Sequence, residues 1–307
     1  MKQLTQPSDL CNSNREVCLA IGMFDGVHLG HQQVLKQTVL DASQNKSLPV
    51  AVTFDQHPAN IISPEKAPAL IQSQAQRIRT IESLGIEATL VIKFNKEFSL
   101  KKGKIFIKEL AEGFGSIHSV CVGNNFMFGH NRDGDIALLE ELGKSMGFLA
   151  HGIQAVSLNE KIISSTRIRN SLRKGSLHDV NKMLGRKFSI EGTIISGDGK
   201  GRKIGYPTAN LDTTGIVLPP NGVYAANAKL NEKIYRSVLN IGIRPTIIRP
   251  EPSIQVEAHL LGFNENIYDK TIEIEFVEQL RDEIAFASTE ELKKQISRDI
   301  NKAQTLF

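Results

Sequence analysis

The chain has 307 residues, of which 40% are hydrophobic and 23% charged, a balance that predicts a soluble globular protein of two domains. Residues 187–307 hold 15 of the 37 basic and 16 of the 33 acidic residues, so residues 1–186 hold 22 basic and 17 acidic residues. This modest basic excess in the first part of the chain favours phosphate-bearing small molecules as ligands. The polar N-terminus, the short apolar runs and the spacing of Cys11, Cys18 and Cys121 predict no signal peptide, membrane span or disulfide scaffold, and so a cytoplasmic protein.

The first half alternates apolar runs with amphipathic stretches. Short apolar runs predict buried parallel strands at 17–22, 50–54, 88–94 and 118–123. Apolar residues three and four apart predict helices between them, at 31–42, 76–85 and 136–147. This alternation indicates a Rossmann-like α/β domain with a parallel sheet, in which ligands bind outside the carboxyl ends of the strands.

The pattern changes near Gly185. Period-two alternation between Gly, Pro and Asn turns predicts short strands at 188–196, 222–230, 233–242, 254–261 and 271–277. A capping-box pattern from Ser288 to Glu291 then opens an amphipathic helix at 288–303. We expect a small antiparallel β-barrel with a terminal helix, and a domain boundary between residues 1–185 and 186–307.

The first chemical motif follows the strand at 17–22. Glycines 22, 26 and 30 allow a tight turn and a close approach to a ligand, as a phosphate site at a strand-to-helix junction requires. His28 and His31 are three residues apart, so both can face a triphosphate at a helix start. The same spacing could serve zinc or ordinary histidines, but no third ligand is suitably spaced, and the strand and glycines favour phosphate.

Two further segments carry candidate ligands. In 163–175, Ser164, Ser165 and Thr166 are hydroxyls at a helix start followed by Arg167, a cluster that suits phosphate oxygens but also suits a well-capped basic helix. In the loop 122–135, Phe126 and Phe128 could stack on a flat ring or simply form an apolar plug.

GMFDGVHLGH, VGNNFMFG and ISSTRIR together resemble the FMN adenylyltransferase module of bacterial bifunctional FAD synthetases, within the nucleotidyltransferases that share an H-x-G-H signature. The resemblance implies that His28 and His31 contact the ATP phosphates in the transition state. It also implies an ATP pocket and a flavin site. The ATP pocket would comprise Gly22, Phe24, Asp25, Gly26, His28, His31, Ser164, Ser165, Thr166 and Arg167, and the flavin site Asn125, Phe126, Phe128 and His57.

This chain departs from the family pattern at two positions. The family commonly has an acidic residue where Asn125 stands, and a proline where Gln56 stands in TFDQHP. An amide at 125 can still hydrogen-bond a flavin or a phosphate, but it brings no negative charge.

The second half carries a Gly- and Lys-rich segment, GDGKGRKIGYPTANL at 197–211, that matches neither a P-loop nor a dinucleotide fingerprint. Such a loop can wrap phosphates, although on composition alone it is more often a mobile turn. Thr208 and Asn210 would face the same way in an extended segment and offer hard oxygen ligands to magnesium. Glu257, within a predicted strand, is either a rim carboxylate or a general base for an alcohol.

GYPTANL, LPPNGVYA, NIGIRPT, VEAHLL and LRDEIAFASTEELKKQISRD resemble the riboflavin kinase module in order and spacing. The resemblance implies that Thr208 and Asn210 bind Mg-ATP, that Glu257 activates the ribityl 5′-hydroxyl and that Arg281 lies near the flavin. The remaining ATP contacts would be Gly197, Gly199, Gly201, Lys203 and Gly205. The expected function is therefore transfer of a phosphoryl group from ATP to riboflavin, which gives FMN, and then of an adenylyl group from ATP to FMN, which gives FAD and pyrophosphate. Both steps are expected to require Mg²⁺.

Three alternatives remain open on the sequence. The chain could be a nucleotidyltransferase for another phosphorylated substrate with an accessory barrel, a flavin-storing or flavin-sensing protein, or a nucleic-acid binder. The first leaves GYPTANL and VEAHLL without a role, and the second predicts lesions in the phosphate motifs, which are intact. The third lacks a basic stripe. We expect small-molecule partners, no nucleic acid and no membrane, and leave a homo-oligomer open.

Overall fold

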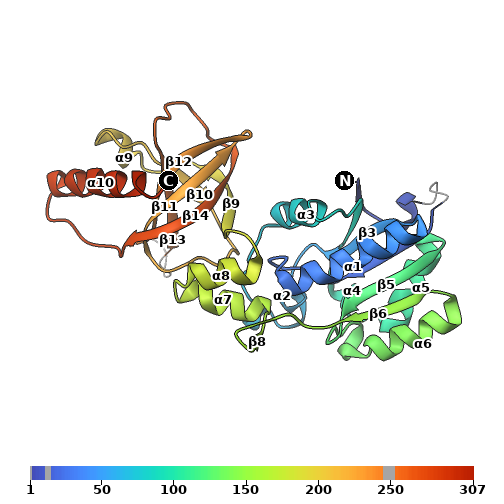
Figure 1. Cartoon of the computed structure of the whole chain (residues 1–307). Coiled ribbons are helices and arrows are strands. Elements are labelled where there is room, and N and C mark those ends of the chain that lie inside the picture. Colours follow the sequence, from blue (N-terminus) through green and yellow to red (C-terminus); the bar gives the residue numbers. More distant parts are fainter. Residues whose placement is uncertain (1, 11–14, 245–252) are drawn as a thin grey trace. The chain divides into compact units, whose positions relative to one another are not determined.

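The structure is a computed structural model that describes residues 2–10, 15–244 and 253–307. The chain forms two compact units, Met1–Leu70 with Gln74–Ser165, and Ile71–Ser73 with Thr166–Phe307 (Figure 1). Cys11 and the end of the NIGIRPT segment, residues 245 and 246, lie outside the described residues. No helix of the described residues is both long and apolar enough to cross a bilayer.

The first unit contains a parallel sheet in the order β1-β4-β3-β2-β5-β6. Its strands are β1 (Lys2–Leu4), β2 (Val17–Ile21), β3 (Leu48–Phe54), β4 (Ala88–Ile92), β5 (Ile117–Gly123) and β6 (Leu149–Ile153). Its α-helices are α1 (Leu29–Asn45), α2 (Ala59–Ile62), α3 (Gln74–Glu82), α4 (Lys96–Ser99), α5 (Gly103–Phe114) and α6 (Ile136–Met146). The 3₁₀ turns η1 (Pro7–Leu10), η2 (Pro64–Lys66) and η3 (His130–Arg132) and the hairpin β7 (Ser157–Leu158) and β8 (Lys161–Ile162) complete it.

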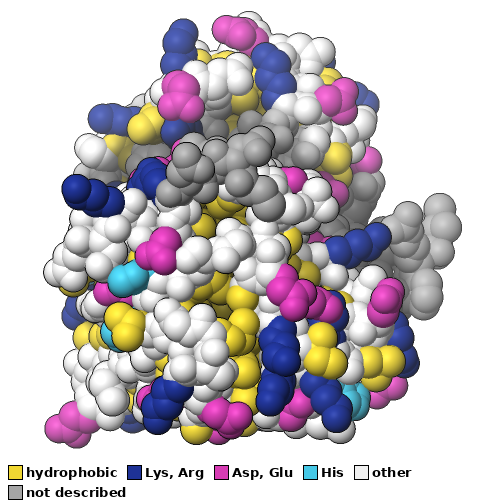
Figure 2. All heavy atoms as spheres, turned by 90° about the vertical axis from the view of Figure 1, so that its right-hand side faces the viewer, with side chains coloured by type: hydrophobic (Ala, Val, Ile, Leu, Met, Phe, Trp, Pro, Cys, Tyr) yellow, Lys and Arg dark blue, Asp and Glu magenta, His cyan; other side chains and the backbone are white. Residues whose placement is uncertain are grey.

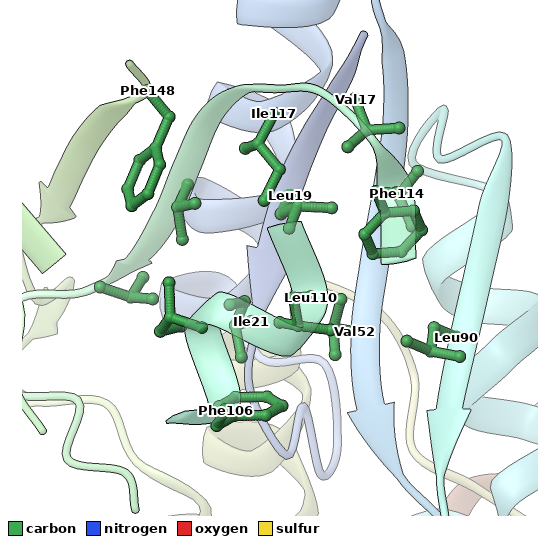
Figure 3. Close-up of a cluster of buried hydrophobic side chains, with 14 of the residues drawn as sticks. Val17, Leu19, Ile21, Val52, Leu90, Phe106, Leu110, Phe114, Ile117 and Phe148 are labelled. Atoms are coloured by element: carbon green, nitrogen blue, oxygen red, sulfur yellow. The ribbon is translucent and has the colours of Figure 1, made fainter. Parts of the chain in front are cut away.

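Helices cover both faces of this sheet. On one face, alternate residues of β2 pack against α5 and α6, and Figure 3 shows Leu19 and Ile21 beside Phe106 and Leu110. On the other face, small residues such as Ala20 and Ala51 meet α1 and α3. Because every residue of β2 and β3 is buried, these strands read as continuous apolar runs. This two-faced packing leaves the carboxyl ends of the strands for the loops that carry the site.

The second unit is a closed antiparallel barrel in the order β10-β13-β12-β11-β14-β9. Its strands are β9 (Ser189–Ile195), β10 (Ala209–Asp212), β11 (Gly222–Leu230), β12 (Lys233–Arg244), β13 (Ser253–Leu260) and β14 (Thr271–Arg281). Its helices are α7 (Ser165–Arg173), α8 (Leu177–Leu184), α9 (Lys200–Lys203) and α10 (Thr289–Gln304). The barrel interior is apolar, with Phe188 and Phe276 stacked at 5.4 Å between ring centroids.

The terminal helix α10 contacts the barrel strands β11, β12 and β14 (Figure 1). Ser288 caps it, because its side chain accepts a hydrogen bond from Glu291 N at 3.2 Å. The Glu291 carboxylate returns to the backbone N–H of Ala287, one residue before the cap. The capping box read from the sequence is therefore present on its hydroxyl side, and it starts α10 where the sequence placed the helix.

The predicted fold classes are confirmed: a Rossmann-like parallel sheet with helices, then a small antiparallel barrel with a terminal helix. The sequence patterns did not reveal the strands β1, β6 and β10. Helices α7 and α8 belong to the second unit, although the sequence placed them before its boundary at 185/186. The division into an adenylyltransferase domain, 1–185, and a kinase domain, 186–307, stays a prediction.

Candidate functional sites

The loop from β2 to α1 has a strained backbone. Phe24 (φ 51°), Gly26 (φ 80°) and Val27 (φ 36°) all lie in the left-handed region, which costs energy for residues other than glycine. Phe24, Asp25 and Val27 are nevertheless buried, and the Phe24 ring lies close over the Cα of Gly22. Such strain persists only when the surrounding packing fixes it, and it is typical of ligand-binding loops.

His28 and His31 form a stacked pair at the start of α1. Their ring centroids are 3.7 Å apart with the planes at 17°, and the edge of Phe24 meets His31 at 5.4 Å. His28 is the N-cap, because its Nδ1 accepts a hydrogen bond from the backbone N–H of His31 at 3.3 Å. Burial above all, and then the positive potential of His28 and Arg77, lower the pKa of His31 well below its usual value. The pair therefore lies at the N-terminus of a helix, where anions are favoured.

The serine-rich segment reaches the same loop. Ser165 Oγ donates a hydrogen bond to the backbone oxygen of Asp25 at 2.9 Å. This contact joins the end of the first unit to the loop that carries the histidines. Ser164 is partly buried beside it, whereas Thr166 and Arg167 belong to the second unit as part of α7.

A cavity of about 810 Å³ opens beside Met23, at the carboxyl ends of β2 and β3. Its walls are rich in aromatic rings, and its rim carries cations and no acidic residue. The aromatic walls are Phe54, Phe94, Phe98, Phe106, Phe126 and Phe128, and the basic groups are His57, Lys96, Lys101, His130 and Arg132. Of the four residues predicted to bind flavin here, His57, Phe126 and Phe128 line the cavity. Asn125 is exposed and lies outside its lining.

The rim loop of this cavity is anchored to α5. The Asp133 carboxylate accepts a hydrogen bond from Gly103 N at 2.9 Å, and His130 N donates to the oxygen of Lys101 at 2.8 Å. Asn131 (φ 54°) and Arg132 (φ 60°) are left-handed in succession. The loop therefore holds a fixed, strained shape at the mouth of the cavity.

In the barrel, three polar side chains stand in one row across neighbouring strands. Asn210 of β10 pairs with Glu257 of β13, which pairs on its other side with Asn240 of β12. Directly paired residues point to the same face of a sheet, and all three line a polar cavity of about 240 Å³. Thr208 and Glu283 line this cavity as well. The structure thus places the predicted Thr208, Asn210 and Glu257 together.

The Gly-rich segment is closely packed at two positions, one of them against Asn210 of this row. A Cβ on Gly197 would fall 2.1 Å from the amide of Asn210, and one on Gly201 would fall 2.4 Å from the oxygen of Tyr206. Gly199 (φ 65°) and Gly205 (φ 92°) are left-handed and face open space. Lys203 is exposed at the end of the short helix α9.

An apolar cavity of about 270 Å³ adjoins the polar one. Val223, Phe286, Leu292 and Ile296 line it, and Glu257, Asn240 and Glu283 line both cavities. Arg281 also lines it, with its guanidinium directed to the buried Asp299 of α10. Nε and Nη2 of Arg281 donate to that carboxylate at 2.8–3.1 Å. A third cavity, of about 430 Å³, runs from Thr208 and Arg202 to the loop at 263–268.

Two residues of these sites were missed by sequence reasoning. Arg77 of α3 is fully buried beside Met23 and Phe54, yet its sequence context, QRIRTIE, is that of an amphipathic helix with basic residues facing solvent. Asn240 lies within NIGIRPT, and only the strand register shows that it stands beside Glu257. In the part of the chain that the structure describes, no three His, Cys, Asp or Glu side chains gather as metal ligands.

Family models match both units. The FAD synthetase model matches residues 11–167, and the riboflavin kinase model matches residues 184–307. The segment between these matches holds most of α7 and α8. The order of the two matches agrees with the order of the two predicted modules.

Curated relatives match the chain over its whole length. Proteins named bifunctional riboflavin kinase/FMN adenylyltransferase are similar to it in Buchnera aphidicola (36% identity over 100% of this chain and 99% of the relative), Bacillus subtilis (36%, 99% and 97%) and Escherichia coli (35%, 100% and 98%). A solved Streptococcus pneumoniae structure, titled a macrolide-efflux protein, covers 98% of both chains with a TM-score of 0.83 at 24% identity. At that identity the likeness shows the fold alone.

Proposed function

This chain belongs to the family of bifunctional riboflavin kinase/FMN adenylyltransferases. We therefore propose that its two reactions take place at the β2–α1 loop, which carries His28 and His31, and at the row of polar side chains around Glu257 in the barrel. The chain is a transferase that phosphorylates riboflavin to FMN and adenylylates FMN to FAD, with ATP as co-substrate in both steps. One observation carries the assignment: each unit has a polar site suited to binding phosphate, and beside it a cavity with apolar walls.

In the adenylyltransferase unit, the ATP phosphates bind at the start of α1. His28 and His31 lie there at the helix N-terminus, and Gly22, Phe24, Asp25 and Gly26 shape the loop. Ser164 and Ser165 supply hydroxyls to the same phosphates, and the contact of Ser165 with Asp25 supports this. The flavin ring stacks in the aromatic cavity between Phe126, Phe128 and His57, and Asn125, which precedes Phe126 in the chain, binds the flavin from outside this lining.

The adenylyl transfer needs no protein nucleophile. An FMN phosphate oxygen attacks the α-phosphorus of ATP in line, and pyrophosphate leaves as the bond to the β-phosphate oxygen breaks. The site contributes positioning and stabilisation of the negative charge that develops on the transferring group. The cationic rim of the aromatic cavity favours a flavin that carries a phosphate over one that does not.

In the kinase unit, Glu257 stands where the alcohol and the phosphate meet. It lines both the polar and the apolar cavity, so a riboflavin ring in the apolar cavity can extend its ribityl chain toward the carboxylate. Glu257 accepts the proton of the 5′-hydroxyl while that oxygen attacks the γ-phosphorus, and ADP leaves. Arg281 forms part of the flavin cavity and holds α10 over it through Asp299.

The nucleotide lies along the Gly-rich segment. Thr208 lines all three barrel cavities described above. This supports binding of the ATP phosphates at Thr208 and Asn210, and of the adenine ring in the cavity of about 430 Å³. Gly197 and Gly201 allow the close approach that their packing already shows, and Gly199, Lys203 and Gly205 lie on the open side of the segment.

The residues of the polar cavity fit a magnesium ion. Its donors are oxygens of a hydroxyl, three amides and three carboxylates, the hard ligands that Mg²⁺ prefers, and its lining contains no sulfur or imidazole. Thr208 and Asn210 would hold the ion together with the ATP phosphates. When bound, Mg²⁺ neutralises charge on the phosphate oxygens.

We further place the protein in the cytoplasm, acting on small molecules and not on nucleic acid. Cys18 and Cys121 are buried free thiols, as expected in a reducing compartment. On the face that Figure 2 shows, Lys and Arg side chains are interspersed with Asp and Glu instead of forming one basic patch. A homo-oligomer stays open to a direct measurement of mass in solution.

The direct experiment incubates the purified full chain with riboflavin and ATP, with and without Mg²⁺, and separates the products by chromatography. FMN should appear first and FAD second, and chelation of Mg²⁺ should stop FMN formation until the ion is restored. Folded protein that yields neither product would contradict the assignment. FMN formation unaffected by chelation would contradict the magnesium site alone.

A further inference from the structure

Arg77 is an arginine buried in the first unit, and it has no ion pair among the residues that the structure describes. Its exposed fraction is 0%, and it is among the largest fully buried side chains of the described residues. Arginine is almost never buried completely unless it is paired, because removing its charge from water is costly. Its Nε is buried without a hydrogen-bond partner in the described part of the chain. Burial lowers the pKa of Arg77, and the carboxylates of Asp25 and Asp55 oppose that effect.

The guanidinium of Arg77 joins two walls of the aromatic cavity. Nη2 donates a hydrogen bond to the backbone oxygen of Phe54, the last residue of β3. Nη1 contacts Sδ of Met23, in the loop after β2, at 3.9 Å. Met23 and Phe54 both line the cavity of about 810 Å³. Arg77 therefore fixes the separation of two strand ends beside the flavin cavity, without reaching the cavity itself.

His31 is held as a neutral imidazole by its surroundings. Its Nδ1 is buried and has no hydrogen-bond partner among the described residues. A protonated ring would place an N–H donor at that atom with nothing to accept it, which costs free energy, so the proton of the neutral ring belongs on Nε2. His28 uses its Nδ1 as an acceptor, so a neutral His28 likewise carries its proton on Nε2.

The charged and titratable groups around His31 and Arg77 come from three segments of the chain. They are Asp25 and His28 of the β2–α1 loop, Asp55 at the end of β3 and Arg77 of α3. Two of them, His28 and Arg77, act on His31, and both disfavour its protonated form after burial has already done so. Arg77 is the permanent charge of the two, since its guanidinium does not titrate in the physiological range.

We propose that Arg77 is a positioning residue of the adenylyltransferase site, which keeps His31 a neutral hydrogen-bond donor while it ties the ends of β2 and β3 together. This inference rests on the proposed role of His31 at the ATP phosphates. The fixed positive charge of the site then resides on a buried group that does not change with pH. His28 and His31 act on the phosphates through Nε2–H bonds, and no proton is transferred by either ring.

The test compares Arg77→Met, which removes the charge at similar length, with Arg77→Lys, which keeps the charge and loses the planar fork. The full chain labelled with ¹⁵N in histidine reports the titration of His31 by NMR, with His31→Asn to assign its signals. The rate of FAD formation from supplied FMN is followed against pH. Riboflavin phosphorylation by the same molecules, in the other unit, is the control for concentration and folding.

In Arg77→Met the pKa of His31 should rise, and the acid limb of kcat/KM for adenylylation should move to higher pH with it. At pH values below the pKa of His31, each unit by which that pKa rises lowers the fraction of neutral His31 about tenfold. Arg77→Lys should retain the wild-type acid limb and raise the KM for FMN. The proposal is overturned if Arg77→Met leaves the titration of His31 unchanged and only lowers stability. If that variant does not fold, a folded Arg77→Lys whose His31 titrates near its ordinary value overturns it instead. The NMR titration requires no turnover, so an inactive wild-type protein would contradict the proposed function and not this inference.

Discussion

Glu257 stands directly opposite Asn210 on the adjacent strand of the barrel, and both side chains face the same polar cavity. Glu257 therefore lies beside the side chain proposed to hold the ATP phosphates, where it can take the proton of the hydroxyl that attacks them. We expect Glu257→Gln to lower riboflavin phosphorylation by at least about a hundredfold, since it keeps the shape and removes the base. FAD formation from supplied FMN should be unchanged.

The exposed Glu278 of β14 lines none of the barrel cavities described above, and Glu278→Gln is the matched control. It should leave both rates within about twofold of the wild type. Equal losses in the two variants would remove Glu257 from the mechanism.

His28 has two roles that separate by substitution. His28→Ala should abolish FAD formation and also destabilise the first unit by about 1 kcal/mol, because α1 loses its cap. His28→Asn should abolish FAD formation without that loss, since an asparagine oxygen can replace Nδ1 as the cap acceptor. Thermal melts and FAD assays measure the two effects, with riboflavin phosphorylation retained in both variants. Adenylylation that survives in His28→Asn would mean that the imidazole contributes only the cap.

Asp299 holds α10 against the barrel by accepting from Arg281 and from Gln295. The side chains of this ion pair are 20% and 5% exposed. Asp299→Ala leaves a cation in a largely buried place, so the second unit should lose about 2–4 kcal/mol of stability, and the KM for riboflavin should rise. Glu232→Gln, which breaks the exposed pair of Glu232 with Lys229, should cost no more than about 1 kcal/mol. Comparable losses in the two variants would contradict a clamp at α10.

Cys121 is expected to resist alkylation in the native protein. Burial, which outweighs the other causes, raises its pKa to about 12, so the thiolate is scarce at pH 8. In a Cys11→Ser background, iodoacetamide at pH 8 should leave Cys18 and Cys121 unmodified until denaturant is added, as mass spectrometry can show. The raised pKa also adds stability that is present below the unfolded value and is lost as the pH rises from about 9 toward 12. Rapid native modification of Cys121 would show that the first unit opens locally.

The sequence predicted the long elements because their periodicity comes from burial on one or two faces. The strand β3 and the helix α10 show this well. It missed β6, whose sequence LAHGI is neither alternating nor wholly apolar, and β10, whose four residues are hidden in the GYPTANL motif. Short strands of this kind exist because neighbours pair with them, which is a tertiary effect.

The candidate sites divide in the same way. Phosphate loops leave a local signal in glycines, hydroxyls and paired histidines, and the structure brings Ser165 to Asp25 and Glu257 to Asn210. Arg77 left no such signal, because an arginine on an amphipathic helix normally faces water. Its side chain contacts Phe54 at the end of β3 and Met23 in the loop after β2, and the spacing of residues along α3 does not encode these tertiary contacts.

The barrel closes through β10, its shortest strand, which lies between β9 and β13. A closed barrel offers no strand edge to another molecule, but the release of β10 would expose two edges at once. The same event would withdraw Asn210 from Glu257. Substitutions that loosen the Gly-rich segment should therefore promote aggregation and loss of riboflavin phosphorylation together, and bound nucleotide should protect against both.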